Sequence, residues 1–221
     1  MKTQQRKLKI TALILLILTI IWVVFTGISM SQVKSSWNNS DLIKWVASPD
    51  IFFIGNYINA TLLTIVAILL FSFLFTFLKP KYENMAIIGF VFIPIYGVIN
   101  LICYSIQIAI VPAVAYNTLN NPDTINLASQ LIQANSKSLI GFINGMAYAI
   151  LGIPSIIYGL LLIKELIKYS GFFLLLNGIL CIIGIIGYVI GNSIVAMGIM
   201  VGGIIFLISL IFMVFEFKYN E

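Results

Sequence analysis

The chain alternates between long apolar runs and short polar stretches. The runs predict six membrane-spanning helices, because each is long enough to cross about 30 Å of hydrocarbon at about 1.5 Å per residue. The last two helices come from one uncharged run, which we divide at Gly191-Asn192-Ser193 because this is the only good turn signal inside it. The expected spans cover residues 10–30, 50–78, 85–116, 138–163, 171–190 and 194–215.

Polar residues and prolines predict the shorter elements. Ser40 is expected to cap a short helix in the loop at 31–48, and Ser48 to cap the second span. In the third span, Pro94 and Pro112 are the expected kink sites. The loop at 118–136 predicts an amphipathic helix, on the membrane surface or over the mouth of the bundle, with an apolar side that comprises Ile125, Ala128, Leu131 and Ile132.

Composition places the chain in a membrane. Hydrophobic residues make up 61% and charged residues only 9% of the sequence, and the mean hydropathy is +1.11, whereas soluble domains carry about 25% charged residues. The predicted fold class is therefore all-α: a polytopic membrane protein with a six-transmembrane-helix bundle, forming a single domain over residues 1–221. The net charge of +5 lies at segment ends, which favours membrane lipids as partners and predicts no nucleic-acid partner.

The basic residues predict the orientation of the bundle. If both termini lie on one side, that side holds most of the basic residues, and the positive-inside rule makes it cytoplasmic. The nine residues on that side are Lys2, Arg6, Lys7, Lys9, Lys79, Lys81, Lys164, Lys168 and Lys218, and the three on the other are Lys34, Lys44 and Lys137. We therefore expect cytoplasmic termini, two long external loops, and the plasma membrane of a prokaryote as the location.

The first apolar run has a second interpretation. Residues 1–9 are basic and polar, so they could precede the apolar region of a cleaved signal peptide. The run is long for such a region and no Ala-x-Ala-like site follows it, which favours an uncleaved first helix.

The residues that usually carry chemistry are absent from the spans. The chain has no histidine, and apart from Asp50 at the start of the second span no Asp, Glu, Lys or Arg falls inside a predicted span, so common general bases, metal ligands and coupling carboxylates are missing. We expect no enzyme activity, no catalytic residue, no metal and no cofactor. Cys103 and Cys181 lie in apolar runs and are interpreted as buried thiols, with a disulfide or redox pair as the alternative.

Uncharged polar residues recur at helical spacing. Tyr96, Asn100, Tyr104 and Gln107 are spaced i, i+4, i+8 and i+11 and share one helical face. Together with polar positions in the second and fourth spans, this face predicts an uncharged intramembrane pocket. The alternative is that these side chains only join helices by hydrogen bonds. The candidate ligand-binding residues are Asn56, Tyr96, Asn100, Tyr104, Gln107, Asn144 and Tyr148.

Glycines form a second pattern. Gly141, Gly145, Gly152 and Gly159 make a small-residue line on the fourth span, and Gly198-x3-Gly202 does so on the sixth. Close helix packing is the expected role of these lines, and a sliding face for alternating access is the alternative.

The sequence also resembles a known family. LLLIKELIKYSGFFLLLNGILCIIGIIGYVIGNS, from span four into span five, resembles the corresponding segment of a widespread prokaryotic six-helix membrane family of unknown function. The matching features are the basic turn, the glycine that opens the next span and the closing Gly-Tyr, here Gly171, Gly187 and Tyr188. The likeness covers residues 50–195 and implies a fold but no activity. The family's histidine early in span four and arginine near the start of span three have no counterpart here.

A weaker likeness is to the substrate-binding subunits of energy-coupling vitamin importers, which are similar in size and helix number. Their alanine-rich docking motif early in span one is missing, because Thr11-Ala12 is followed by Leu-Ile-Leu-Leu. Docking to a coupling subunit is therefore not implied.

Two functions follow as hypotheses. In the first, the protein binds, and moves or senses, a neutral or lipidic small molecule in the uncharged pocket. In the second, it is a non-catalytic structural or assembly partner, joined to another membrane protein or to a second copy through the face of Gly198 and Gly202.

Overall fold

The computed structural model describes residues 2–34, 36–135 and 137–217. These residues form helices and connecting turns and contain no strand, which confirms the all-helical prediction. The α-helices are α1 (Lys2–Ser31), α2 (Asn39–Ala47), α3 (Ile51–Ser105), α4 (Val111–Leu119), α5 (Ile125–Ser129), α6 (Leu139–Lys164), α7 (Lys168–Val189), α8 (Ser193–Ala196) and α9 (Gly198–Glu216). A π-helical segment at Ile106–Ile110 joins α3 to α4, and a 3-10 turn at Pro122–Thr124 precedes α5.

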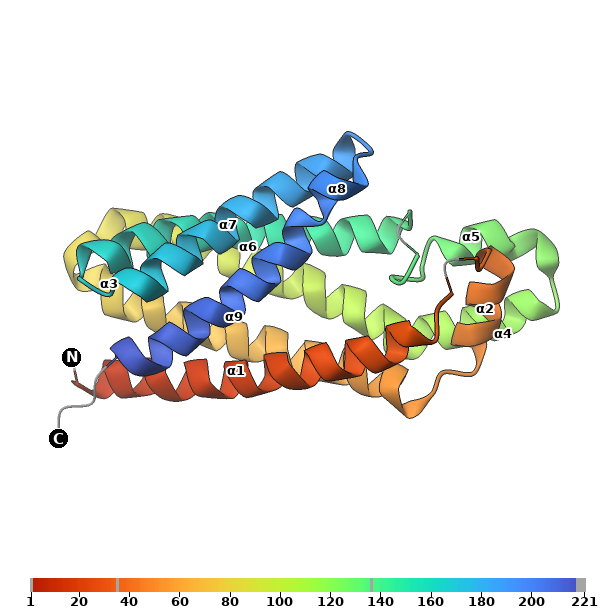
Figure 1. The fold of residues 1–221 in the computed structure, drawn as a ribbon, viewed down its shortest axis with the longest axis horizontal. Helices are drawn as coiled ribbons and strands as arrows, with labels where there is room; N and C mark the ends of the chain where they lie inside the picture. The colour runs from red at the N-terminus through yellow and green to blue at the C-terminus, as the bar shows by residue number, and fades with distance from the viewer. Residues whose placement is uncertain (1, 35, 136, 218–221) are drawn as a thin grey trace.

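In the described part of the chain, five helical segments are long and apolar enough to cross a membrane. The longest runs from Ile51 to Leu119, across the region where the sequence predicts two spans. Tyr82 interrupts it with non-helical backbone angles, φ −133° and ψ 48°. Figure 1 shows the chain turning back at the end of the bundle where the termini lie. We refer to the parts before and after Tyr82 as the first arm (51–81) and the second arm (83–105).

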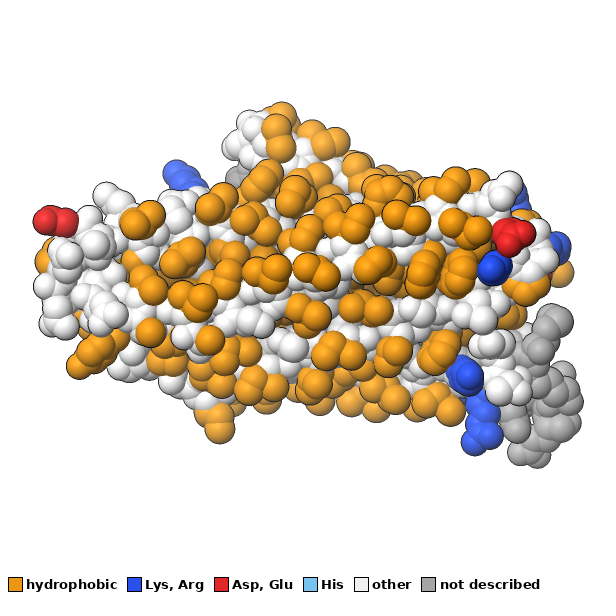
Figure 2. Space-filling model, turned by 180° about the vertical axis from the view of Figure 1, so that it is seen from behind, with side chains coloured by type: hydrophobic (Ala, Val, Ile, Leu, Met, Phe, Trp, Pro, Cys, Tyr) orange, Lys and Arg blue, Asp and Glu red, His pale blue; other side chains and the backbone are white. Residues whose placement is uncertain are grey.

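The helices pack in a closed order around one apolar core. α1 contacts α3 and α9, α9 contacts α7, α7 contacts α6, and α6 contacts α3. Fully buried residues from α1, α3, α6, α7 and α9 fill the centre, among them Leu15, Phe71, Tyr158, Leu174 and Leu210. The outer surface is apolar instead of polar, as expected for helices in lipid. Figure 2 shows hydrophobic side chains over the middle of the bundle and charged ones towards its ends.

Glycines bring α6, α7 and α9 into backbone contact, as the sequence predicts. A Cβ atom added at Gly159 of α6 would lie 2.6 Å from the backbone nitrogen of Leu175 and 2.7 Å from the carbonyl oxygen of Gly171. One added at Gly198 of α9 would lie 2.8 Å from the carbonyl oxygen of Leu180. Backbones that pack this closely leave no room for a side chain. The Gly198–Gly202 face is therefore occupied by α7 of the same chain.

A second, smaller core lies at the end of the bundle away from the described termini (Figure 1). α2, α4 and α5 enclose it, and we call these helices with their connecting turns the cap. Buried side chains from α2 and α5 meet the start of α3 there. The apolar side predicted in the loop at 118–136 faces this core, with Ala128 and Ile132 buried and Ile125 and Leu131 partly buried. The helix itself is only the short α5, so the prediction was too long.

Two predicted helix caps were wrong by two residues. α2 is capped by Asn38 and not by Ser40, because Asn38 accepts the N–H groups of Ser40 and Asp41 while Asp41 accepts the N–H of Asn38. α3 is capped by Asp50 and not by Ser48. Burial alone would raise the pKa of Asp50, but hydrogen bonds from Gln32 and from the N–H of Phe53 lower it, which keeps this cap ionised.

The chain beyond the second arm shows how Pro112 is accommodated. Pro94 lies inside α3 without a break, whereas the helix before Pro112 widens into the π-helical segment. There the N–H of Val111 bonds to the carbonyl of Ile106, five residues back. Proline crowds the carbonyl four residues earlier and has no N–H of its own, so a wider turn removes the conflict.

We predict that Gly159→Ala destabilises the protein, by about 1–3 kcal/mol, because the added methyl overpacks the contact with α7. Gly203→Ala is the matched control, since a Cβ atom there meets nothing within 4 Å, and alanine favours the helix. Thermal unfolding in the same detergent tests both. Equal stability of the two variants would show that the close contact is not needed.

Candidate functional site

Three amide side chains from different segments form a head-to-tail chain of hydrogen bonds. The amide nitrogen of Gln133 donates to the oxygen of Asn144 over 3.1 Å, and the nitrogen of Asn144 donates to the oxygen of Asn100 over 3.0 Å. Asn100 belongs to the second arm of α3, Asn144 to α6 and Gln133 to the turn after α5. This amide chain therefore links two membrane helices to the cap.

Both ends of the amide chain are buried without a partner among the described residues. They are the Nδ2 atom of Asn100 and the Oε1 atom of Gln133. If nitrogen and oxygen were exchanged in all three amides, the direction would reverse, but one donor and one acceptor would still be left over. A buried polar group without a hydrogen bond costs about 1–3 kcal/mol, so such groups usually hold a water or a ligand.

Gln107 fixes the cap to the bundle through backbone atoms. Its side-chain nitrogen donates to the carbonyl of Leu131 over 2.8 Å, and its oxygen accepts the N–H of Gln133 over 3.0 Å. Gln107 is fully buried and lies in the π-helical segment. π-helical turns are frequent at functional sites. This one carries Gln107, which holds the turn after α5, the cap turn, in place.

Tyrosines continue the contact between the second arm and α6. The hydroxyl groups of Tyr104 and Tyr148 are 2.7 Å apart, and the ring of Tyr148 lies 6.0 Å from that of Tyr96. On the cap side, the ring of Tyr57 lies 6.2 Å from that of Tyr104. Six of the seven candidate residues thus come together along the second arm and α6.

Asn56 is the exception. Its side-chain oxygen accepts a hydrogen bond from Thr26 of α1 over 2.9 Å, on the first arm of α3. Asn59 makes a similar bond to the carbonyl of Leu18 over 2.9 Å. These residues join α1 to the first arm, and among the described residues the side chain of Asn56 bonds to Thr26 and not to the amide chain or the tyrosine pair.

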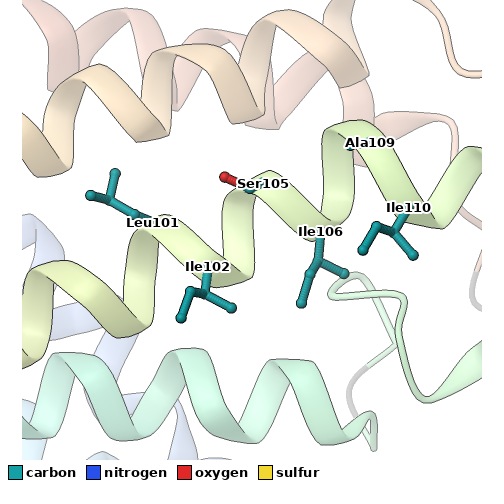
Figure 3. Close-up of a pocket in the computed structure, with 6 residues that line it drawn as sticks. All are labelled: Leu101, Ile102, Ser105, Ile106, Ala109 and Ile110. Carbon is teal, nitrogen blue, oxygen red and sulfur yellow. The ribbon is translucent and has the colours of Figure 1, made fainter.

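Neither of the two best-formed hollows is lined by a candidate residue. The two best-formed hollows have volumes of about 320 and 330 Å³ and lie on the outside of the second arm. The first is lined by residues from consecutive turns of one stretch of helix, including Ile102, Ser105 and Ile110, as Figure 3 shows. At 100° per residue this surface is opposite Asn100 and Tyr104. The hollows are therefore apolar surface features, and the polar residues face the interior.

Gln133 is the site residue that sequence reasoning missed. It lies in the turn after α5, where helical periodicity gives no signal. The polar run Gln130–Gln133–Asn135 was the available hint, since all three side chains bond to groups in or next to the cap.

Both cysteines are buried free thiols, as interpreted from the sequence. Cys181 lies in α7 beside Asn177, which donates to the carbonyl of Gly202 over 2.9 Å and so joins α7 to α9. In the described part of the chain no group of three or more His, Cys, Asp or Glu residues could hold a metal ion.

No protein-family model, curated protein or solved structure matches the chain. The family resemblance therefore rests on the sequence pattern alone.

We predict that Tyr104→Phe and Tyr148→Phe are coupled in stability. Removing either hydroxyl breaks the same hydrogen bond. The loss of unfolding free energy in the double variant should therefore be smaller than the sum of the losses in the two single variants, by about 0.6–1.7 kcal/mol. Tyr158 is the control, because its hydroxyl donates to the carbonyl of Ala86, and Tyr104→Phe with Tyr158→Phe should be additive. Unfolding of the three single variants, the two double variants and the wild type measures this, and additivity of the first pair would contradict the bond.

Proposed function

We propose that the protein is a multi-pass membrane protein of six spans with cytoplasmic termini, which binds an uncharged or lipidic small molecule under the cap. The sixth span is gained by counting the two arms of α3 separately on either side of Tyr82. The observation that carries the proposal is the amide chain, because it presents a free buried donor and a free buried acceptor at the junction of cap and bundle.

The chemistry of the junction selects the class of ligand. Asn100, Tyr104, Gln107, Asn144 and Tyr148 are all uncharged, so an ionised ligand would lie in a poorly solvating interior without a counter-charge. An alcohol, amide or similar group can match one donor and one acceptor together. The surrounding aromatic rings favour a ligand with an apolar body.

We take this structure as a closed form, in which the turn after α5 lies over the amide chain. The bonds from Gln107 to Leu131 and Gln133 help to hold that turn. Side-chain hydrogen bonds inside membrane proteins contribute about 0.6 kcal/mol each. Ligand binding has to offset the loss of these bonds and of the packing of Ile132, which is fully buried in the cap core.

The first test is native mass spectrometry of the protein released gently from its membrane. We expect one small molecule per chain to survive desolvation, and its mass gives its chemical class. Bare protein, or only a mixture of bulk phospholipids, would contradict the proposal.

A matched pair of variants connects the ligand to the amide chain. Asn100→Leu removes the free donor and should lower ligand occupancy at least tenfold, which corresponds to about 1.4 kcal/mol. Asn56→Leu is the control, since Asn56 is also a buried asparagine of α3 but bonds to α1. Gln133→Leu serves where Asn100→Leu fails to fold. An equal loss of ligand occupancy in Asn56→Leu would show that the buried asparagines stabilise the fold and do not bind the ligand.

A further inference from the structure

Two helical connections meet at the end of the bundle where the described termini lie. One is the fold-back of α3 at Tyr82, and the other is the turn from α6 to α7. The carboxylate of Glu165 joins them, because it pairs with Lys81 over 2.6 Å and accepts the hydroxyl of Tyr82 over 2.8 Å. Spanning helices leave the apolar layer at such turns, so this junction lies at the depth of lipid headgroups.

The two connections carry more positive than negative charge, because Lys79, Lys81, Lys164 and Lys168 are accompanied only by Glu83 and Glu165. Hydrogen bonds from Lys81 and Tyr82 lower the pKa of Glu165, so this carboxylate is ionised and already matched by Lys81. The ammonium group of Lys164 lies 5.9 Å from the centre of the Tyr82 ring, and that of Lys81 lies 5.4 Å from it. Among the described residues, no carboxylate forms an ion pair with Lys164.

The turn from α6 to α7 also exposes an apolar residue, Leu166, whose backbone conformation is energetically costly. Leu166 has φ 63°, in the left-handed region that usually requires glycine, and it is 77% exposed. Leucine there gains nothing from the protein core, because it points away from it. An apolar side chain next to lysines at the end of a spanning helix instead matches the boundary between headgroups and acyl chains.

We propose that Lys81, Tyr82, Lys164 and Leu166 form a binding site for an anionic phospholipid. The lipid phosphate contacts the ammonium group of Lys164 at the rim of the Tyr82 ring, beside Lys81, which stays paired with Glu165, and the start of an acyl chain packs on Leu166. Charge complementarity selects an anionic lipid, since a zwitterionic headgroup would bring its own cation to the uncompensated Lys164. The site is independent of the ligand under the cap and shares no residue with it.

The test measures binding of phosphatidylglycerol and of phosphatidylcholine to the full-length protein in detergent by native mass spectrometry. The wild type should retain phosphatidylglycerol in preference to phosphatidylcholine. Lys164→Gln should weaken phosphatidylglycerol about fivefold, the factor that one lysine contributes near an anionic surface, and Lys164→Arg should restore it. Lys44→Gln is the control, because Lys44 is an exposed lysine of the cap at the opposite end.

The variant Glu165→Gln distinguishes lipid binding from a purely structural role of these residues at the junction. Removing the carboxylate frees Lys81 as a second phosphate donor, so the variant should bind phosphatidylglycerol more tightly although it loses the tie between the two turns. Three outcomes would overturn the proposal: equal weakening by Lys164→Gln and Lys44→Gln, equal retention of the two lipids, or displacement of phosphatidylglycerol by inorganic phosphate at equal concentration. The last would assign the site to a free anion.

Discussion

The fold depends on the direct contact of helix backbones across α6, α7 and α9. In lipid, apolar side chains gain little by leaving one apolar environment for another, so helices associate through dispersion and polar bonds. Dispersion is strongest where backbones approach most closely, which only glycine allows. Gly159 against Leu175 and Gly198 against Leu180 provide that approach on two faces of α7. Some of the remaining apolar side chains fill the core between the helices, and the others point outward.

The other half of the bundle is held differently. α1 and the first arm of α3 are joined by side-chain bonds, from Thr26 to Asn56 and from Asn59 to Leu18. The second arm meets α6 through the amide chain and the tyrosine pair. A side-chain bond can break and form again with water or with a ligand group, whereas a backbone contact at glycine has no second partner. The glycine-packed half is therefore the rigid part, and the polar contacts are where the structure can yield.

Much of this architecture could be predicted from the sequence, and the failures have physical reasons. Helix type and the two glycine lines follow from apolarity and spacing, which act locally. The cap of α2 was assigned to Ser40 in place of Asn38 because both residue types accept N–H groups, and only the backbone position decides between them. Gln133 was missed because its role depends on a turn that brings its side chain to Asn144, which lies 11 residues further along the chain. The polar stripe formed by Tyr96, Asn100, Tyr104 and Gln107 was predicted from the helical spacing of these residues. Spacing alone cannot show whether polar side chains face one another or an open space.

Hydrogen bonds along the amide chain bear on that last distinction. Buried amides that join segments can be fully satisfied, as both atoms of Gln107 are, although Asn177 joins α7 to α9 and still leaves its Oδ1 atom without a partner among the described residues. Asn100 and Gln133 each leave one atom unmatched at opposite ends of the same chain. A buried unmatched group has a cost that persists as long as nothing fills it. In the function that we propose, a ligand would match these two atoms, and the cap over Gln133 would keep lipid and bulk water from competing for them.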